Sequence, residues 1–286
     1  MNQRLFLSDV IIIAYASLLS AIALIGQIPD WLIFCLFHLL AIALVLLVHL
    51  GYSRNPNRFW TLVKYWMVII FVLAAYREVY YFVPAVTSGV LYDRALQELD
   101  QSIFGTLANA HNILPSNLLS DVLSVCYWMY FPMPIILGLV LYSRNLKREF
   151  RNGISALLLG WFVSYIGYIL VPALGPYATE FPRAEHLSGY VLADIMHNSV
   201  MLNIQWGAPD AFPSGHTLVT LMTLTYAFRF HRKTFYWILP FGSGLILATV
   251  YLRYHYLIDV MVSMLLWPLL VWCADRLFNR WERTRR

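Results

Sequence analysis

The chain has 286 residues, of which 60% are apolar, 16% aromatic and 12% charged, and its formal net charge is +5. Soluble domains carry about 25% charged residues, so this composition, with a mean hydropathy of +0.64, excludes an ordinary soluble protein and predicts an integral membrane protein. Cys35, Cys126 and Cys273 lie in or beside apolar segments without a pairing pattern and are interpreted as small buried hydrophobes.

Eight apolar segments are long enough to cross a bilayer, which takes about 17–25 residues each. They are 8–26, 31–50, 59–83, 119–142, 152–172, 213–230, 235–254 and 256–275. No small-residue cleavage site follows the first segment, so we interpret it as a membrane anchor. The predicted fold is an all-α, polytopic membrane helical bundle of about eight transmembrane helices. It is expected to be a single membrane domain, 1–286, with two accessory spans in 1–52 and a six-helix core in 59–276.

The basic residues predict the orientation of the chain. With eight spans both termini share a side, and that side holds 16 of the 20 Lys and Arg residues, leaving Arg77, Arg94, Arg183 and Arg253 on the other. Cytoplasmic loops carry the excess of basic residues, so both termini are expected to be cytoplasmic. The positive charge is then expected to face anionic lipid, and no nucleic acid partner is predicted.

A short amphipathic helix is expected between the third and fourth spans. Leu91, Ala95, Leu99 and Ile103 recur at helical spacing with charges between them, and Gly105 follows as a stop. The segment is too short and polar to span, so it is expected to lie in the membrane interface. The loop 172–213 is the longest extramembrane stretch and is expected to cover or line a site.

The sixth span opens with Pro213-Ser214-Gly215-His216. Proline suits the first turn of a helix, and the free N–H groups at a helix start attract phosphate. Ser214 could donate to a phosphoryl oxygen, Gly215 would let a ligand approach the backbone, and His216 could protonate a leaving oxygen. The alternative is that the segment only caps the span and His216 packs at the interface.

His255 and Asp259 follow between the seventh and eighth spans. Residues four apart share one face of a helix, so Asp259 can accept from one ring nitrogen of His255 and leave the other as a nucleophile. Arg253 adds a cation that can bind two phosphoryl oxygens. The alternative is an interfacial pair of Arg253 and Asp259 beside a satisfied histidine. Both motifs fall on the predicted non-cytoplasmic face, which favours phosphoryl transfer there.

These two segments resemble the second and third motifs of the phosphatidic acid phosphatase type 2 superfamily, the membrane lipid phosphatases and phosphotransferases. The resemblance covers the last six spans. It implies that His255 is the nucleophile that forms a phosphohistidine, that His216 is the acid and that Asp259 orients His255. It implies no metal and no other cofactor.

Two departures point to one branch of that family. The family's Ser-Arg falls on Ala248-Thr249, and its first-motif lysine is absent. The segments 251–259 and 100–105 resemble the inositolphosphotransferase-like branch, which includes inositol phosphorylceramide synthases and, more distantly, sphingomyelin synthases. Arg183, Arg77 and Arg94 are candidates for the missing cation. The expected phosphate-binding residues are Ser214, Gly215, Arg253 and Arg183.

The expected function is that of a membrane lipid phosphatase or phosphotransferase acting on a lipid phosphate or phospholipid at the non-cytoplasmic face, which is periplasmic, extracellular or lumenal. Water would resolve the intermediate in a phosphatase, and an alcohol or lipid acceptor would do so in a transferase. Two other classes stay open. His216, His255 and Asp259 also satisfy a two-histidine, one-carboxylate metal site. A lipid transporter would use buried polar groups as a pathway, although the inverted repeats of many transporters are not seen in the sequence.

Overall fold

The computed structural model describes residues 4–105, 116–180, 189–205 and 209–283, with residues 201–205 described by their backbone alone. The regular secondary structure of these residues is helical, and one isolated bridge pairs Ala173 with Asp210. The helices are α1 (Leu7–Gly26), α2 (Trp31–Arg54), α3 (Arg58–Trp66), α4 (Val68–Thr87), α5 (Asp93–Phe104), α6 (Asn117–Trp128), α7 (Pro132–Ser143), α8 (Lys147–Leu170), α9 (Pro176–Glu180), α10 (Leu192–Gln205), α11 (Gly215–Phe230), α12 (Arg232–Tyr251) and α13 (Leu257–Arg283).

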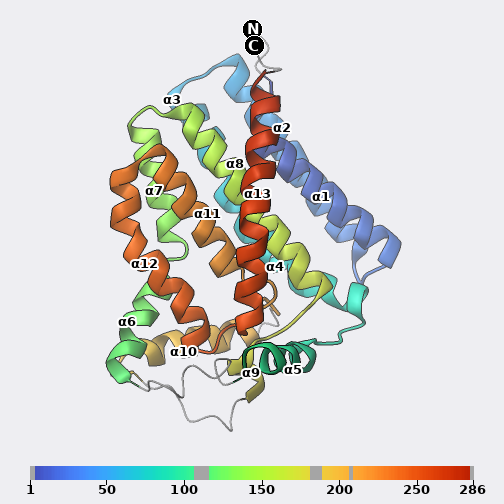
Figure 1. The fold of residues 1–286 in the computed structure, drawn as a ribbon. Helices are drawn as coiled ribbons and strands as arrows, with labels where there is room; N and C mark the ends of the chain where they lie inside the picture. Colours follow the sequence, from blue (N-terminus) through green and yellow to red (C-terminus); the bar gives the residue numbers. More distant parts are fainter. Residues whose placement is uncertain (1–3, 106–115, 181–188, 206–208, 284–286) are drawn as a thin grey trace.

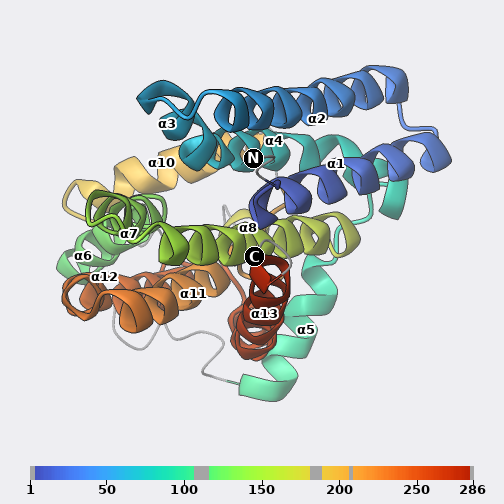
Figure 2. The same cartoon turned by 90° about the horizontal axis from the view of Figure 1, so that it is seen from above.

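The long helices form one bundle with two different ends. Both termini lie at one end, and α5, α9 and α10 lie at the other (Figure 1). Seen along the bundle, α8 runs through the middle (Figure 2), where it packs against α1, α4, α7, α11 and α13. The all-α, polytopic class predicted from the sequence is therefore confirmed.

Small residues explain why α8 occupies the centre. A Cβ atom at Gly160 would lie 2.7 Å from the sulfur of Met222 on α11, and one at Gly167 would collide with the ring of Pro213. Helices in a membrane gain stability by close packing at small residues rather than by excluding water from apolar side chains. The glycines of α8 thus let α11 approach and fix where that helix begins.

The number of membrane spans is not confirmed as eight. Within the described residues six helices are long and apolar enough to cross a membrane, or seven if the pair α6 and α7, bent by 45°, forms one broken span. The remaining expected span, 213–230, is α11, which has 16 residues. At 1.5 Å per residue it is roughly 24 Å long, shorter than the hydrocarbon core of about 30 Å.

The amphipathic segment forms α5, and its acidic face packs on the protein. Asp93, Leu96 and Asp100 are buried, whereas Leu99 and Ile103 are 44% and 55% exposed. Asp93 accepts hydrogen bonds from the N–H groups of Leu174 and Gly175 at 2.9–3.1 Å.

Asp100 supports the start of α13. Its carboxylate accepts from Ile258 N at 2.7 Å. Burial raises the pKa of the Asp100 carboxyl, and its bonds to backbone N–H groups oppose that rise. The apolar stripe of α5 is left to face outward, as an interfacial helix requires.

Replacing Asp100 tests this support. Asp100→Ala leaves Ile258 N–H without its acceptor and should lower the free energy of unfolding by about 1–3 kcal/mol, measured by thermal unfolding in detergent. Asp100→Asn keeps an acceptor and should recover most of the loss. Glu98→Ala is the control, because its pair with Arg94 is exposed and should contribute less than about 0.5 kcal/mol. Equal effects of Asp100→Ala and Glu98→Ala would contradict the assignment.

Candidate active site

A helical hairpin brings the two sequence motifs together. α11 runs from Ser214 to the turn at His231, and α12 returns along it. The segment between α12 and α13 then lies beside the start of α11, and Ser214 N donates to the carbonyl of Asp259 at 3.2 Å. Ser263 fastens this junction by donating to the carbonyls of Ser214 and Asp259, both at 2.9 Å.

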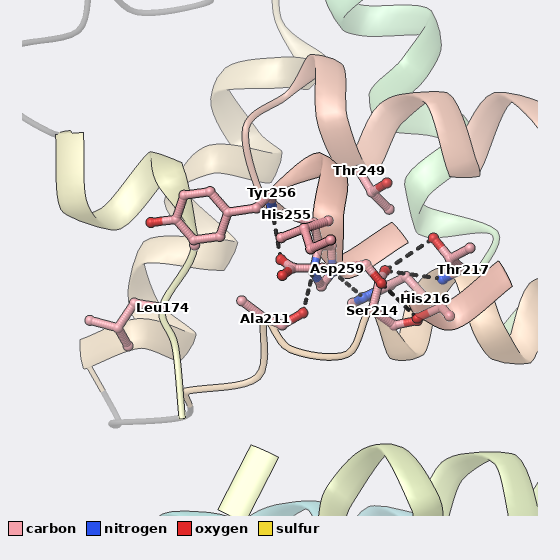
Figure 3. A network of polar contacts seen from close by, with 12 residues as sticks. Leu174, Ala211, Ser214, His216, Thr217, Thr249, His255, Tyr256 and Asp259 are labelled. Atoms are coloured by element: carbon pink, nitrogen blue, oxygen red, sulfur yellow. Dashed lines mark hydrogen bonds and ion pairs between the residues drawn. The ribbon is translucent and has the colours of Figure 1, made fainter. Parts of the chain in front are cut away.

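His255 is the centre of the site and is 3% exposed. Its Nδ1 lies 2.7 Å from the carbonyl oxygen of Ala211, and its Nε2 lies 3.3 Å from Nδ1 of His216 (Figure 3). A carbonyl oxygen can only accept, so Nδ1 of His255 carries the proton. In the neutral ring Nε2 then holds the lone pair, and His216 is the donor between the two rings. The network thus places a lone pair on Nε2 of His255 and a proton on the facing Nδ1 of His216.

Asp259 lies in the first turn of α13 and is fully buried. Its Oδ2 is 3.6 Å from Nδ1 of His255, an ion-pair distance, and accepts a hydrogen bond from Tyr256 N at 2.8 Å. The sequence predicts that Asp259 takes the proton-bearing nitrogen of His255 as its partner. The structure differs, because the backbone carbonyl of Ala211 is the closer acceptor. Asp259 supplies negative charge near the ring and holds the turn in which His255 lies.

Ser214 and Gly215 are engaged with the protein in this structure. The Ser214 hydroxyl accepts from Thr217 N at 3.2 Å and donates to Thr217 Oγ1 at 3.1 Å, so Ser214 caps α11. A Cβ at Gly215 would collide with the hydroxyl of Tyr168. The glycine is therefore required by packing. The capping interpretation of this motif describes Ser214 well, whereas His216 faces His255 instead of packing in the interface.

A cavity of about 330 Å³ opens beside the two histidines. His216 lies against two aromatic rings there, stacked on Tyr127 at 4.5 Å and tilted against Tyr130 at 4.3 Å between ring centroids. Among the described residues, the wall of this cavity contains neither Lys nor Arg. Its polar side chains are mostly tyrosines, Tyr76, Tyr127, Tyr130, Tyr165, Tyr168, Tyr177 and Tyr254. Met196, Ser199 and Val200 show that α10, from the loop expected to line a site, does so.

Asp210 also lines this cavity, and the sequence analysis did not select it. Its Oδ2 accepts a hydrogen bond of 2.6 Å from the Tyr76 hydroxyl of α4. Burial raises the pKa of the Asp210 carboxyl, while the Tyr76 hydrogen bond opposes that rise. The sequence feature that could have identified Asp210 is its position three residues before Pro213, in the segment that leads into α11.

Arg253, Arg77 and Arg94, which the sequence offered as phosphate-binding cations, do not line the cavity. Arg253 has a left-handed φ of 63°, and its carbonyl accepts from Tyr177 N at 2.7 Å. Its half-buried side chain is not part of the cavity wall. Arg183 lies outside the described residues. Of the other candidates, Arg94 is 92% exposed and paired with Glu98, and Arg77 is exposed on α4.

The alternative metal site finds no support in the side-chain arrangement. Within the described part of the chain, no three or more His, Cys, Asp or Glu side chains form a group that could hold a metal ion. In particular, Nδ1 of His255 is taken by the Ala211 carbonyl, and Asp259 is bonded to Tyr256 N.

The sequence was compared with known proteins. The profile described as "PAP2 superfamily" matches residues 94–273, which is more than half of the chain. A curated relative from Bacteroides thetaiotaomicron, named phosphoinositol dihydroceramide synthase, is 24% identical over 190 residues, covering 59% of this chain and 62% of the relative. The chain thus spans less than two thirds of that relative's length. No solved structure matches. The relative's name agrees with the branch that the motifs of 100–105 and 251–259 resemble, and the profile match shows that the chain belongs to the PAP2 superfamily.

Proposed function

We propose that this protein is a membrane lipid phosphatase or phosphotransferase that cleaves a lipid phosphate ester through a phosphohistidine at His255. The observation that carries the proposal is the hydrogen-bond chain from Ala211 O through His255 to His216, with a cavity at its end. These hydrogen bonds leave a lone pair on Nε2 of His255 facing a proton on Nδ1 of His216. These are the two groups that nucleophilic displacement at phosphorus needs.

The reaction then runs in two halves. Nε2 of His255 attacks phosphorus, the N–P bond forms, and the bond from phosphorus to the leaving oxygen breaks as His216, in its protonated imidazolium form, donates a proton to that oxygen. Water or an acceptor alcohol next gives its proton to His216 and attacks phosphorus, and the N–P bond breaks. Because His216 now occupies the space in front of Nε2, at 3.3 Å, the two rings must part for the phosphoryl group to enter. Asp259 stabilises the positive charge that develops on His255, and Ser214 and Gly215 keep the start of α11 in place.

The cavity wall favours a donor lipid with a hydroxylated headgroup. Tyrosine hydroxyls and the Asp210 carboxyl can donate to and accept from headgroup hydroxyls. The relative named phosphoinositol dihydroceramide synthase makes transfer of a phospho-headgroup to a lipid alcohol the second candidate. We propose that Arg183 and Arg253 meet the phosphate charge, and that Arg253 turns toward the cavity when substrate binds.

We further propose that the site faces the non-cytoplasmic side and that both termini are cytoplasmic. The basis is the distribution of Lys and Arg along the sequence. The placement of both termini at the end of the bundle opposite α5, α9 and α10 is consistent with it (Figure 1).

Histidine variants test the chemistry. We expect His216→Ala to lower kcat by about 10²–10⁴-fold and His255→Ala to lower it by about 10⁶-fold, since the second removes the nucleophile. His231→Ala, at the far end of the hairpin, should retain turnover. With a substrate labelled on phosphorus, rapid quenching should leave label on the peptide containing His255. Substantial turnover by His255→Ala in folded protein would refute the mechanism.

The products decide between hydrolysis and transfer. Purified protein in lipid would be given phospholipids labelled in the headgroup phosphate, with and without ceramide or another lipid alcohol. Transfer predicts a labelled lipid that forms only with the acceptor, whereas a water-soluble labelled product alone would remove the transferase alternative. Turnover should be unchanged by chelators, and its loss in chelator would restore the metal hypothesis.

Asp210 should make stability depend on pH in a defined direction. Because its pKa is raised in the folded protein, the folded state binds more protons than the unfolded state, and stability falls as pH rises from the unfolded pKa of about 3.9 through the folded pKa. Asp210→Asn, which mimics the protonated acid, should gain Tm relative to wild type as pH rises from 4 to 7. Tyr76→Phe removes the hydrogen bond that opposes the rise in the Asp210 pKa. The stability of this variant should therefore fall more steeply with rising pH than that of wild type. A Tm difference between Asp210→Asn and wild type that is constant with pH would contradict the assignment.

A further inference from the structure

A second cavity lies on a different face of α4 from the active site. It has a volume of about 240 Å³ and is enclosed by α1, α2, α4 and Phe162 of α8. Tyr76 of α4 lines the catalytic cavity, whereas Glu78 of the same helix lines this one. Apart from Tyr15, His38 and Glu78 its wall is apolar. Leu40, Leu44 and Ile70 of this wall are exposed. Since α1, α2 and α4 all belong to candidate membrane spans, the cavity opens toward the hydrocarbon of the bilayer.

A chain of polar side chains crosses the wall of this cavity. Ser20 Oγ lies 2.9 Å from Nδ1 of His38, and Nε2 of His38 lies 3.1 Å from Oε2 of Glu78. The His38 and Glu78 side chains are only 3% and 10% exposed. If Ser20 donates to His38 and His38 donates to Glu78, every group of the chain is satisfied except the second carboxylate oxygen of Glu78.

Two buried polar atoms at this cavity have no hydrogen-bond partner among the described residues. They are Oε1 of Glu78 and the hydroxyl of Tyr15. The Tyr15 ring is held by stacking on Phe162 at 4.0 Å between centroids, so its hydroxyl is fixed in direction. Polar groups left unpaired in a low-dielectric interior are costly, and ionisable groups in membrane spans usually serve a function. A partner from outside the chain would remove that cost.

We propose that this cavity binds a lipid alcohol, that is, a neutral lipid whose hydroxyl donates to Oε1 of Glu78 and accepts from the hydroxyl of Tyr15. One hydroxyl supplies both a donor and an acceptor, which is what the two unpaired atoms require. The apolar remainder of the wall, from Ile12 to Phe162, accommodates hydrocarbon. Long-chain alcohols, diacylglycerols and ceramides share this chemistry. The site is separate from the catalytic histidines, so the inference does not rest on the proposed reaction.

Photolabelling of the full chain in phosphatidylcholine nanodiscs tests the proposal. The probes are a long-chain alcohol, a diacylglycerol and a ceramide, each with a diazirine near the hydroxyl, and the O-acetylated form of each probe, which cannot donate. We expect labelled peptides from α1, α2 and α4, suppressed by excess unlabelled alcohol but not by its acetate. Comparison of the three probes identifies which lipid alcohol fits best. His255→Ala should label as wild type does, which separates this site from the catalytic one.

Three variants test whether the labelled site is this cavity. Glu78→Gln keeps the side-chain volume but weakens the hydrogen bond to the ligand, and should reduce competable labelling by about tenfold. Ala41→Phe fills the cavity while keeping Ser20, His38 and Glu78, and it should abolish competable labelling. This variant keeps the test valid if Glu78→Gln does not fold. Leu47→Phe is the matched control, because Leu47 is exposed on α2 and is not part of the wall. Equal labelling by alcohols and acetates, or full competable labelling of Ala41→Phe, would overturn the proposal.

Discussion

The need to pair backbone N–H groups wherever a helix begins is the constraint on which the end of the bundle with the candidate site depends. In an apolar environment an unpaired N–H is costly, and the non-helical connections at this end carry several. Carboxylates accept hydrogen bonds from these N–H groups. Asp93 accepts from Leu174 and Gly175. Asp100 accepts from Ile258, and Asp259 accepts from Tyr256. Asp121 of α6 does the same for Ala193 near the start of α10. Acidic residues that resemble surface charges in the sequence therefore hold the connections in position.

This pairing extends to His255 through the backbone. Asp93 fixes the segment after α8, the carbonyl of Ala173 in that segment accepts from Ala211 N at 3.0 Å, and the carbonyl of Ala211 accepts from His255. The tautomer of His255 is thus set by a backbone carbonyl whose position depends on α5. A structural helix that touches neither histidine consequently influences which ring nitrogen is available to a substrate.

Residue patterns predicted the helices and the chemical types at the site, but not the contacts between distant segments. The length and hydropathy of the apolar runs predicted the long helices, and the Pro213–His216 and His255–Asp259 spacings predicted helix starts at a shared end. The role of Ala211 was not predictable, because its carbonyl carries no side-chain signature. Which face of α5 packs on the protein was not predictable either, because periodicity identifies an apolar stripe but does not show whether that stripe contacts lipid or protein. The count of eight spans is not confirmed, because α11, with 16 residues, is shorter than the helices that have the length and hydropathy of a membrane span.

The hairpin of α11 and α12 constrains the number of residues between the two histidines. The 38 residues between them cross the bundle and return, so each residue inserted within either helix would rotate its end by about 100° and shift it by about 1.5 Å. A separation of 3.3 Å between Nε2 of His255 and Nδ1 of His216 would not survive such a change. The two helices of the hairpin should therefore tolerate substitutions better than insertions or deletions. A change in chain length should be tolerated best at the turn at His231.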